Sequence, residues 1–447
     1  MDKLIQNFSI KSIADFFFTK ISSFQKIAEN FDYILKDKDF EHFSNLEKIG
    51  DAKFKDESDL LVFACKFNGL LSERSSKKRQ FEIAKKVLKE DFKDGAIFIF
   101  YDENNCFRFS FIRKNYGNKE QKFTNWKRYT YFVDPSKTNK TFRNRINGCN
   151  FSSLEDIQEA FSVEKLNKVF YSEISKHFYQ LIGGTYLDNK KEKTEIACLK
   201  LPSTPVDDKN NRVKYQEFAV RLIGRTIFCW FLKNKKSDSG IPLIPEEWLS
   251  SNMVASVNND QHNYYHAILE KLFFLVLNKK VEDRKPYVLP SNHEFVPFLN
   301  GGLFEAQDDD FFPKDNKGIH SQNFALNIPN QWFRDFFETL EQYNFTIDEN
   351  SINDFEVSID PEMLGTIFEN LLAEIDPDTE KSARKSTGSF YTPREIVDYM
   401  VEQSLLQYIK TKTNIEESEL EFLLKDDSAD LTTFQKLSNL LSHLFLS

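Results

Sequence analysis

The sequence has few of the residues that mark flexible linkers, and it lacks the short motifs of several common sites. Its 447 residues include 14 glycines and 13 prolines, with no G-x-G triplet and no Pro-Pro pair. Neither glycine pair, Gly183-Gly184 or Gly301-Gly302, is followed by Lys-Ser/Thr at the spacing of a phosphate loop. The seven histidines form no H-E-x-x-H motif. The missing motifs argue against a Walker-type nucleotide site and a zincin-type metal site. Because glycine and proline are scarce, we expect most of the chain to be ordered.

Cysteine is scarce and widely spaced. No C-x-x-C pair occurs among the five, which are Cys65, Cys106, Cys149, Cys198 and Cys229. That arrangement leaves neither a disulfide framework nor a thiolate zinc site.

Long hydrophobic runs are also missing. The runs Thr226–Leu232 and Leu272–Leu277 are far shorter than the roughly 20 residues that span a bilayer. The apolar stretch from Ile10 to Phe18 is interrupted by Asp15, and no small-residue cleavage site follows it. We therefore expect a cytoplasmic protein without a membrane partner.

Positive charge does not dominate, whereas apolar residues are plentiful. The 60 Lys and Arg residues face 69 Asp and Glu residues, which gives a net charge of −9 and argues against a small histone-like protein. Any nucleic-acid site must then be a local patch. A length of 447 residues suggests roughly three domains of about 150 residues, and the 40% hydrophobic content, with 46 phenylalanines, is ample for sizeable buried cores.

The first third of the chain predicts a mixed α/β domain. Apolar residues from Ile10 to Ile27 recur at spacings of three and four, which predicts amphipathic helices up to about residue 50. A buried strand is expected at Leu60–Phe67, followed by a helix from Glu73 to Glu90. The basic face of that helix consists of Arg74, Lys77, Lys78 and Lys85. Three further strands are indicated by aromatic and β-branched segments at Ala96–Tyr101, Phe107–Ile112 and Arg128–Val133.

Helical periodicity dominates the middle of the chain. It is clear from Val163 onward and continues through Phe218–Leu232 and Tyr264–Leu277, with proline-bearing connections between them. The resulting fold prediction is a multidomain α+β protein. It has an α/β domain at 1–155 that is nuclease-like or contacts DNA, a mainly helical connector at 156–385, and a third segment at 386–447.

The segment from Asn105 to Arg145 has the composition of a DNA-contacting surface. It contains eleven basic residues, two acidic residues and ten interleaved aromatic residues. Lysine and arginine neutralise phosphates, and exposed aromatic rings stack on bases. The residues predicted to contact double-stranded DNA are Arg108, Arg113, Lys127, Arg128, Arg143 and Arg145. The alternative is a β-meander whose aromatic residues form a core and whose basic residues are solvated.

A magnesium-dependent nuclease site would need paired carboxylates and a lysine, typically in an Asp/Glu-x-Lys triplet at a strand end. Asp51-Ala-Lys53 and Asp91-Phe-Lys93 have the spacing but do not lie in apolar strands. The strand ending at Lys66 is apolar, but Ala64 occupies the carboxylate position. We therefore assign no catalytic or metal residues, and magnesium is expected only if a nuclease site is intact.

Three segments in the last third of the chain are more specific. They are Phe298-Leu-Asn-Gly-Gly-Leu-Phe-Glu305, Ile359-Asp-Pro-Glu-Met-Leu-Gly-Thr-Ile-Phe-Glu-Asn-Leu-Leu372 and Gly388-Ser-Phe-Tyr-Thr-Pro393. Asp360-Pro361 predicts an N-cap and first turn for a helix that buries Leu364, Ile367, Phe368 and Leu371. Thr392-Pro393 predicts the start of a second helix.

In this order the segments resemble the adenine-specific (N6) DNA methyltransferases of fused restriction-modification enzymes, the type IIG class. The helical stretch with Arg221-Leu-Ile-Gly-Arg225 is also similar to the connector of that family. The resemblance runs from about residue 160 to 406. It implies that 386–447 begins a Rossmann-like methyltransferase domain.

The resemblance also implies a cofactor. Phe390, Tyr391, Thr392 and Pro393 match the family turn that packs against S-adenosylmethionine. The glycine-rich G-x-G turn and the Asn-Pro-Pro-Tyr loop that holds a flipped adenine do not occur in this sequence. The expectation is therefore a truncated N-terminal and connector portion that does not bind the cofactor or transfer a methyl group alone, and whose partners are DNA and a missing methyltransferase portion. The alternative is a stand-alone DNA-binding or interaction module left from a split or interrupted enzyme.

Overall fold

The computed structural model describes residues 2–91, 94–115, 125–188, 191–205, 211–237, 240–257, 263–286, 288–289, 295–299, 302–312, 326–346, 354–373 and 394–412. The chain divides into two compact units, Met1–Ala383 and Arg384–Ser447.

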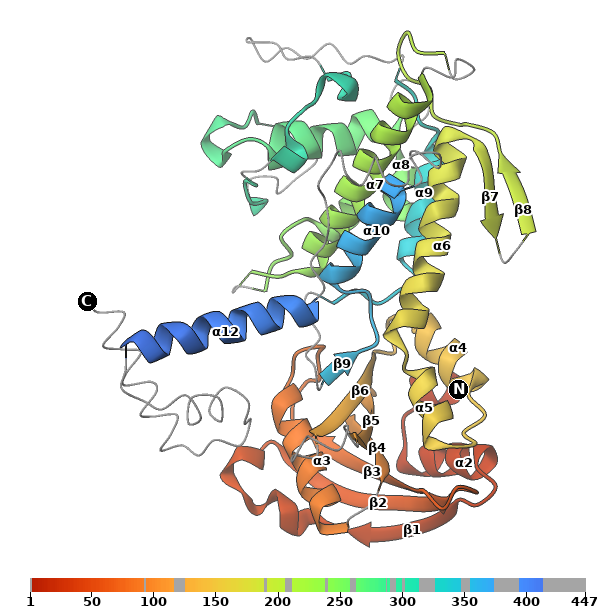
Figure 1. Cartoon of the computed structure of the whole chain (residues 1–447), viewed down its shortest axis with the longest axis vertical. Helices are drawn as coiled ribbons and strands as arrows, with labels where there is room; N and C mark the ends of the chain where they lie inside the picture. The colour runs from red at the N-terminus through yellow and green to blue at the C-terminus, as the bar shows by residue number, and fades with distance from the viewer. Residues whose placement is uncertain are drawn as a thin grey trace. The chain divides into compact units, whose positions relative to one another are not determined.

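The N-terminal part of the first unit is built on a seven-stranded mixed sheet with strand order β1-β2-β3-β4-β5-β6-β9 (Figure 1). The pairs β3/β4 and β6/β9 are parallel and the other neighbours are antiparallel. The strands are β1 (Gln25–Asn30), β2 (Phe43–Lys53), β3 (Asp59–Phe67), β4 (Gly95–Tyr101), β5 (Phe107–Asn115), β6 (Asn125–Val133) and β9 (Asp354–Glu356). The last strand therefore comes from a distant part of the chain.

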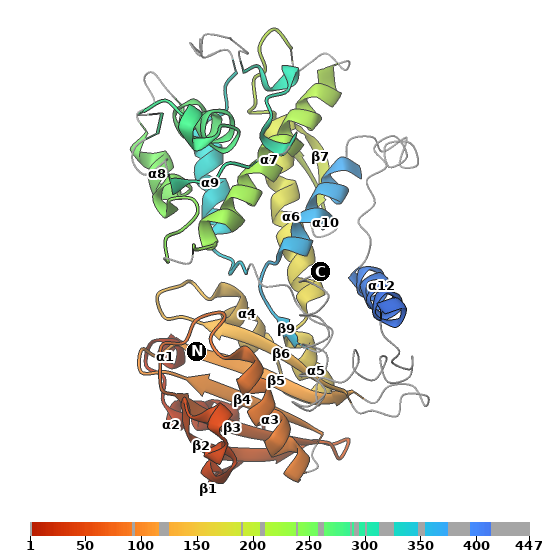
Figure 2. The same ribbon diagram turned by 90° about the vertical axis from the view of Figure 1, so that its left-hand side faces the viewer.

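Helices cover both faces of this sheet, and α3 lies on the opposite side from α2, α4 and α5 (Figures 1 and 2). A hydrophobic core lies on each face of the sheet, and alternate residues of β3 pack into one or the other. Leu60, Val62 and Ala64 pack on one side, and Leu61, Phe63 and Cys65 pack on the other. Burial on both faces explains why the strand has a continuous apolar sequence. The helices are α1 (Asp2–Gln6), α2 (Ile10–Lys20), the 3₁₀ turns η1 (Asp32–Lys36) and η2 (Lys38–Phe40), α3 (Lys77–Asp91), α4 (Lys140–Gly148) and α5 (Leu154–Ala160).

The prediction of helices up to about residue 50 is wrong beyond α2. Residues 25–30 and 43–53 form β1 and β2. Register shifts between Ser44 and Glu47 and between Lys48 and Gly50 interrupt the β2/β3 pairing. These irregularities break the two-residue alternation, so buried side chains fall at Phe43, Leu46 and Ile49, three residues apart as in a helix. The strands predicted at β3, β4, β5 and β6, and the helix at α3, are confirmed.

The rest of the first unit is mainly helical, as predicted. Residues 264–277 are helical with two π-helical turns, η5 and η6. The elements are α6 (Val163–Ile182), the hairpin β7 (Gly184–Asp188) and β8 (Lys191–Glu195), α7 (Arg212–Asn234), η4 (Glu246–Trp248), α8 (Ser251–Ser256), η5 (Tyr265–Leu269), η6 (Leu272–Leu277), η7 (Val281–Asp283), η9 (Gly302–Phe304), η10 (Asp308–Asp310), α9 (Asn330–Leu340) and α10 (Pro361–Ala373).

Local sequence explains the bounds of α6. Ser162 caps its start by accepting a hydrogen bond from the backbone N–H of Lys165. The helix ends at Gly183, whose φ of +71° favours glycine. A Cβ there would lie 2.9 Å from the backbone nitrogen of Ala197. The turn into the β7–β8 hairpin therefore requires glycine.

The second unit contains α12 (Arg394–Lys412), which exposes an apolar surface. Ile396, Val397, Met400 and Leu405 are 41 to 58% exposed. The Rossmann-like start at 386–447 and the domain boundaries near 155 and 385 stay predictions. Within the described residues, no helix has the length and apolar character needed to cross a membrane.

Candidate functional site: a clamped motif loop and a buried charge cluster

Arg225 of α7 holds the end of the Leu-Asn-Gly-Gly-Leu-Phe motif and the segment that follows it. Its guanidinium donates two hydrogen bonds to the carboxylate of Asp310, from Nη1 to Oδ1 at 2.9 Å and from Nη2 to Oδ2 at 3.0 Å. It also donates to the carbonyls of Leu303 at 2.6 Å and Glu305 at 3.1 Å. The side chains of Arg225 and Asp310 are only 4% and 1% exposed. This geometry fixes the loop from 302 to 310 on the helix.

The Asp310 carboxylate accepts further hydrogen bonds besides those from Arg225. Asp310 also accepts hydrogen bonds from Nε of Arg221 at 3.2 Å and from the backbone N–H of Gln307 at 2.8 Å. The ring of Phe274 lies 5.2 Å from the Arg225 guanidinium carbon. Removing either partner of such a buried ion pair is strongly destabilising, because the other charge stays buried without its partner.

Helix α10 carries the Asp-Pro-Glu-Met-Leu-Gly motif and packs against α6 and α7 (Figure 1). The Asp360 carboxylate accepts a hydrogen bond from the backbone N–H of Met363 at 3.0 Å, and Pro361 is the first helical residue. Met363, Ile367 and Leu371 are buried. The predicted capped helix is confirmed, as is the burial of Ile367 and Leu371. Leu364 is only partly buried, and the side chain of Phe368 lies outside the described part of the chain.

Both the loop from 302 to 310 and α10 contact α7, and we call these three segments the motif core. These are three of the segments on which the sequence resemblance depends. The fourth, the turn Phe390, Tyr391, Thr392 and Pro393, lies outside the described residues. Its contact with S-adenosylmethionine therefore stays a prediction.

Two of the six residues predicted to contact DNA lie in the interior, because Arg108 and Arg128 are fully buried. Nη2 of Arg108 donates to the carbonyls of Ser72 at 2.9 Å and Glu73 at 2.8 Å. Nη1 of Arg128 donates to the carbonyl of Lys77 at 2.9 Å. Arg108 thus holds the residues just before α3, and Arg128 holds the first residue of the helix. The composition of this segment predicted surface positions for both arginines, but neither is exposed.

The same arginines hold β9. Nε of Arg128 donates to Oδ1 of Asp354 at 2.8 Å, and Nη2 bonds the other carboxylate oxygen. Burial alone would raise the pKa of Asp354, but the charge and hydrogen bonds of Arg128 hold that pKa below its ordinary value. The rings of Tyr129 and Phe355 stack beside this pair at 5.3 Å.

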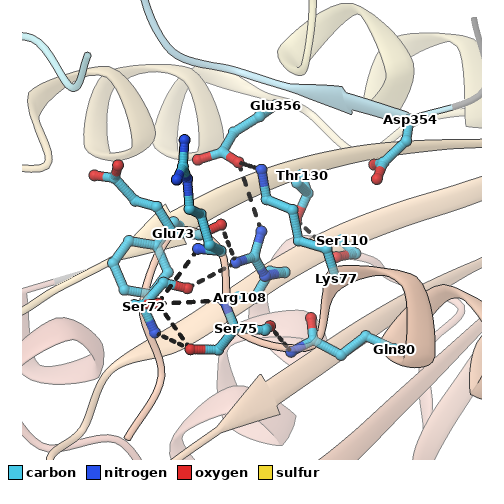
Figure 3. Close-up of polar contacts among 12 residues, drawn as sticks. Ser72, Glu73, Ser75, Lys77, Gln80, Arg108, Ser110, Thr130, Asp354 and Glu356 are labelled. Carbon is cyan, nitrogen blue, oxygen red and sulfur yellow. Dashed lines mark hydrogen bonds and ion pairs between the residues drawn. The ribbon is translucent and has the colours of Figure 1, made fainter. Parts of the chain in front are cut away.

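Glu356 is the second carboxylate of this cluster (Figure 3). It forms an ion pair with Lys77, and Nη1 of Arg108 lies 3.6 Å from its Oε2. Burial lowers the pKa of Arg108, and the charge of Glu356 opposes that effect. The hydroxyls of Ser110 and Thr130 share a 2.7 Å hydrogen bond in the same cluster. Residues 354–356, which lead toward α10, are therefore tied to the sheet and to the start of α3.

The other four predicted DNA contacts are partly exposed and differ in their surroundings. Arg113 donates to Glu155 at 2.8 Å and to Gln158 at 3.0 Å. It lines a shallow pocket of about 240 Å³ whose remaining lining residues are Asp56, Glu57, Ser58, Asp94, Leu154 and Glu155. These carboxylates would repel a phosphate. Lys127 lies 6.0 Å from the ring of Phe355, and Arg143 and Arg145 are half-buried on α4.

The candidate nuclease triplets are engaged in local ion pairs. Asp51 pairs with Lys48 at 2.8 Å, and Lys53 pairs with Glu57. In the third candidate, Lys66 pairs with Glu103 at 2.9 Å. Ala64 is buried opposite Glu47 in the β2/β3 pairing. Of the Asp91 triplet, the position of Lys93 lies outside the described residues. No three His, Cys, Asp or Glu side chains gather to hold a metal ion in the part of the chain that the structure describes.

A buried titratable pair lies in the helical part. Nδ1 of His266 is 2.8 Å from Oε2 of Glu270, and its Nε2 is 2.8 Å from the carbonyl of Leu326. Two acceptors on one imidazole favour the doubly protonated ring. Burial opposes the charge, but the hydrogen bond and charge of Glu270 raise the pKa of His266 above its ordinary value.

Comparison with known proteins found a distant relative among restriction-modification enzymes. The chain is 27% identical over 257 residues to a protein of Methanocaldococcus jannaschii that is provisionally described as a type II restriction enzyme and methyltransferase. The matched stretch covers 56% of this chain and 19% of that protein's length. No family model matches the chain, and no solved structure matches it. This similarity supports a relationship to restriction-modification enzymes as a class.

Sequence reasoning missed the acidic partners Asp310, Asp354 and Glu356. Asp310 is 85 positions from Arg225, and Asp354 is 226 positions from Arg128. No periodicity links residues so far apart. The available signal was the density of arginines inside aromatic strands, since a buried arginine needs a carboxylate or carbonyl partner.

Proposed function

We propose that this chain is the N-terminal and connector part of a site-specific adenine-N6 DNA methyltransferase of the type II restriction-modification class. Its role there is to contact duplex DNA and to provide one edge of the S-adenosylmethionine pocket. The observation that carries the proposal is the motif core, in which α7 packs against α10 and, through Arg225, clamps the loop from 302 to 310. The restriction-modification relative supports the same class.

The cofactor edge of the proposal rests on the order of motifs in the sequence. Helix α10 is anchored by the Asp360 cap and by buried Ile367 and Leu371. The chain then runs on to Phe390, Tyr391, Thr392 and Pro393, the turn that resembles the family's cofactor-binding motif. S-adenosylmethionine would supply the methyl group. Phe390 and Tyr391 would offer apolar surface to it, and no catalytic residue is assigned to this chain.

Binding of duplex DNA by the full chain tests the proposal. A surface with about six phosphate contacts should lose about three decades of affinity between 50 and 200 mM salt. Fluorescence anisotropy with a labelled 30-base-pair duplex measures this dependence. The absence of binding at 50 mM salt, or binding that does not change with salt, would contradict the proposed DNA contact.

A further inference from the structure

Helix α3 presents lysines on the face turned away from the sheet. Its buried residues are Ile83, Ala84, Val87 and Leu88. Lys78, Lys85 and Lys89 follow at spacings of seven and four residues, which places them together on the opposite side of the helix. Figure 2 shows α3 lying across the strands on the outside of this part of the molecule. We call these three lysines the α3 basic face.

Several cations of the 105–145 segment are buried or form ion pairs within the protein. Among the described residues, the three lysines of the α3 basic face do neither. Arg108 and Arg128 are buried, Arg113 pairs with Glu155, and Lys137 pairs with Glu73 at 2.8 Å. In the part of the chain that is described, none of the three α3 lysines forms an ion pair. Lys85 lies 4.8 Å from the ring of Phe81, and Lys78 and Lys89 are exposed.

The platform under these lysines is held firmly. Arg108 and Arg128 bond the backbone carbonyls at 72, 73 and 77, and Lys77 at the start of the helix pairs with Glu356. These contacts fix the start of the helix, and its buried residues from Ile83 to Leu88 pack in the core on this face of the sheet. Among the α3 side chains that the structure describes, Glu82 is the one carboxylate.

We propose that the α3 basic face is the surface through which this chain binds the phosphate backbone of duplex DNA, an inference that rests on the proposed function. From Lys78 to Lys89 the helix rises about 17 Å at 1.5 Å per residue. The same length of duplex carries about ten phosphate charges, at one per 1.7 Å of axis. Lysines act as point charges without base selectivity, so this surface provides affinity and orientation and does not read sequence.

The test replaces the three lysines together, as Lys78→Gln, Lys85→Gln and Lys89→Gln, because glutamine keeps helix propensity. The slope of log affinity against log salt should fall by about 2.7, and affinity at 50 mM salt by about tenfold or more. The control variant, Lys165→Gln, Lys168→Gln and Lys176→Gln, removes the same charge from exposed positions of α6 and should bind like the wild type. Arginine at the three α3 positions should restore the slope.

A second measurement needs no variant. Lysine acetylation of the wild-type chain, read by mass spectrometry with and without duplex, should show protection at 78, 85 and 89 and none at 165, 168 and 176. If the wild type binds DNA while the α3 variant keeps its slope, or if the α3 lysines are not protected, this inference is wrong and the proposed function stands. If the wild type does not bind DNA, the proposed function itself fails.

Discussion

The clamp between Arg225 and Asp310 predicts a large loss of stability from a single small change. Asp310→Asn keeps the shape of the side chain but removes its charge. Asp310 is 1% exposed and accepts from two arginines, so the Arg225 charge would remain buried with only carbonyl acceptors. Breaking a buried pair in this way costs about 3 to 5 kcal/mol. We expect a value near 3 kcal/mol, because asparagine can still accept one hydrogen bond.

Urea unfolding followed by tryptophan fluorescence measures this loss. Trp230, Trp248 and Trp332 are buried in the helical part and report on its unfolding. The matched control is Glu338→Gln, which breaks the Arg334–Glu338 pair on the surface of α9, where the side chains are 52% and 48% exposed. That change should cost less than about 1 kcal/mol. An Asp310→Asn loss no larger than that of the control would refute the assignment of the clamp.

Three further predictions concern pH, the cofactor and the second unit. Because the folded-state pKa of His266 is raised, the stability from its pair with Glu270 is complete below about pH 6.5 and is lost as pH rises through the folded-state pKa. Thermal unfolding from pH 6 to 9 should show this loss in the wild type and not in Glu270→Gln. Calorimetry should detect very weak or no binding of S-adenosylmethionine by this chain, and micromolar affinity would contradict that expectation. Helix α12 exposes several apolar side chains, and at roughly 25 cal/mol per Å² their exposure forfeits several kcal/mol of stability. Limited proteolysis should therefore cut after about residue 385 first. Protection of 385–410 equal to that of Phe218–Leu232 would contradict this prediction.

The regular parts of the fold could be predicted because local pattern and tertiary environment agree. The α6 residues Leu166, Phe170, Ile174 and Phe178 recur every four positions and are all buried. In β1 and β2 the local sequence pattern and the tertiary environment disagree. β1 is an edge strand with almost no buried side chains, and the irregular pairing of β2 places its buried residues three apart. A pattern of this kind cannot be distinguished from a helix without knowing the neighbouring strand.

The sequence predicted the motifs of the candidate site but not the distant residues that bond to its arginines. The Asp360 cap depends on residues a few positions apart and could be read from the sequence. The roles of Arg108 and Arg128 depend on β9, which joins the sheet by only three residue pairs. Composition alone treats every arginine as a surface cation. Burial is what separates the arginines that hold the fold from the α3 lysines that remain available to a partner.

Methyl transfer to adenine is the most direct test of the proposed function. The protein is isolated from its own cells together with everything that copurifies, and is incubated with labelled S-adenosylmethionine and unmethylated duplex DNA, whose nucleosides are then separated. We expect N6-methyladenine with the copurified assembly and none with the purified chain alone. DNA binding without methylation by either preparation, or label found on cytosine, would contradict the proposed function.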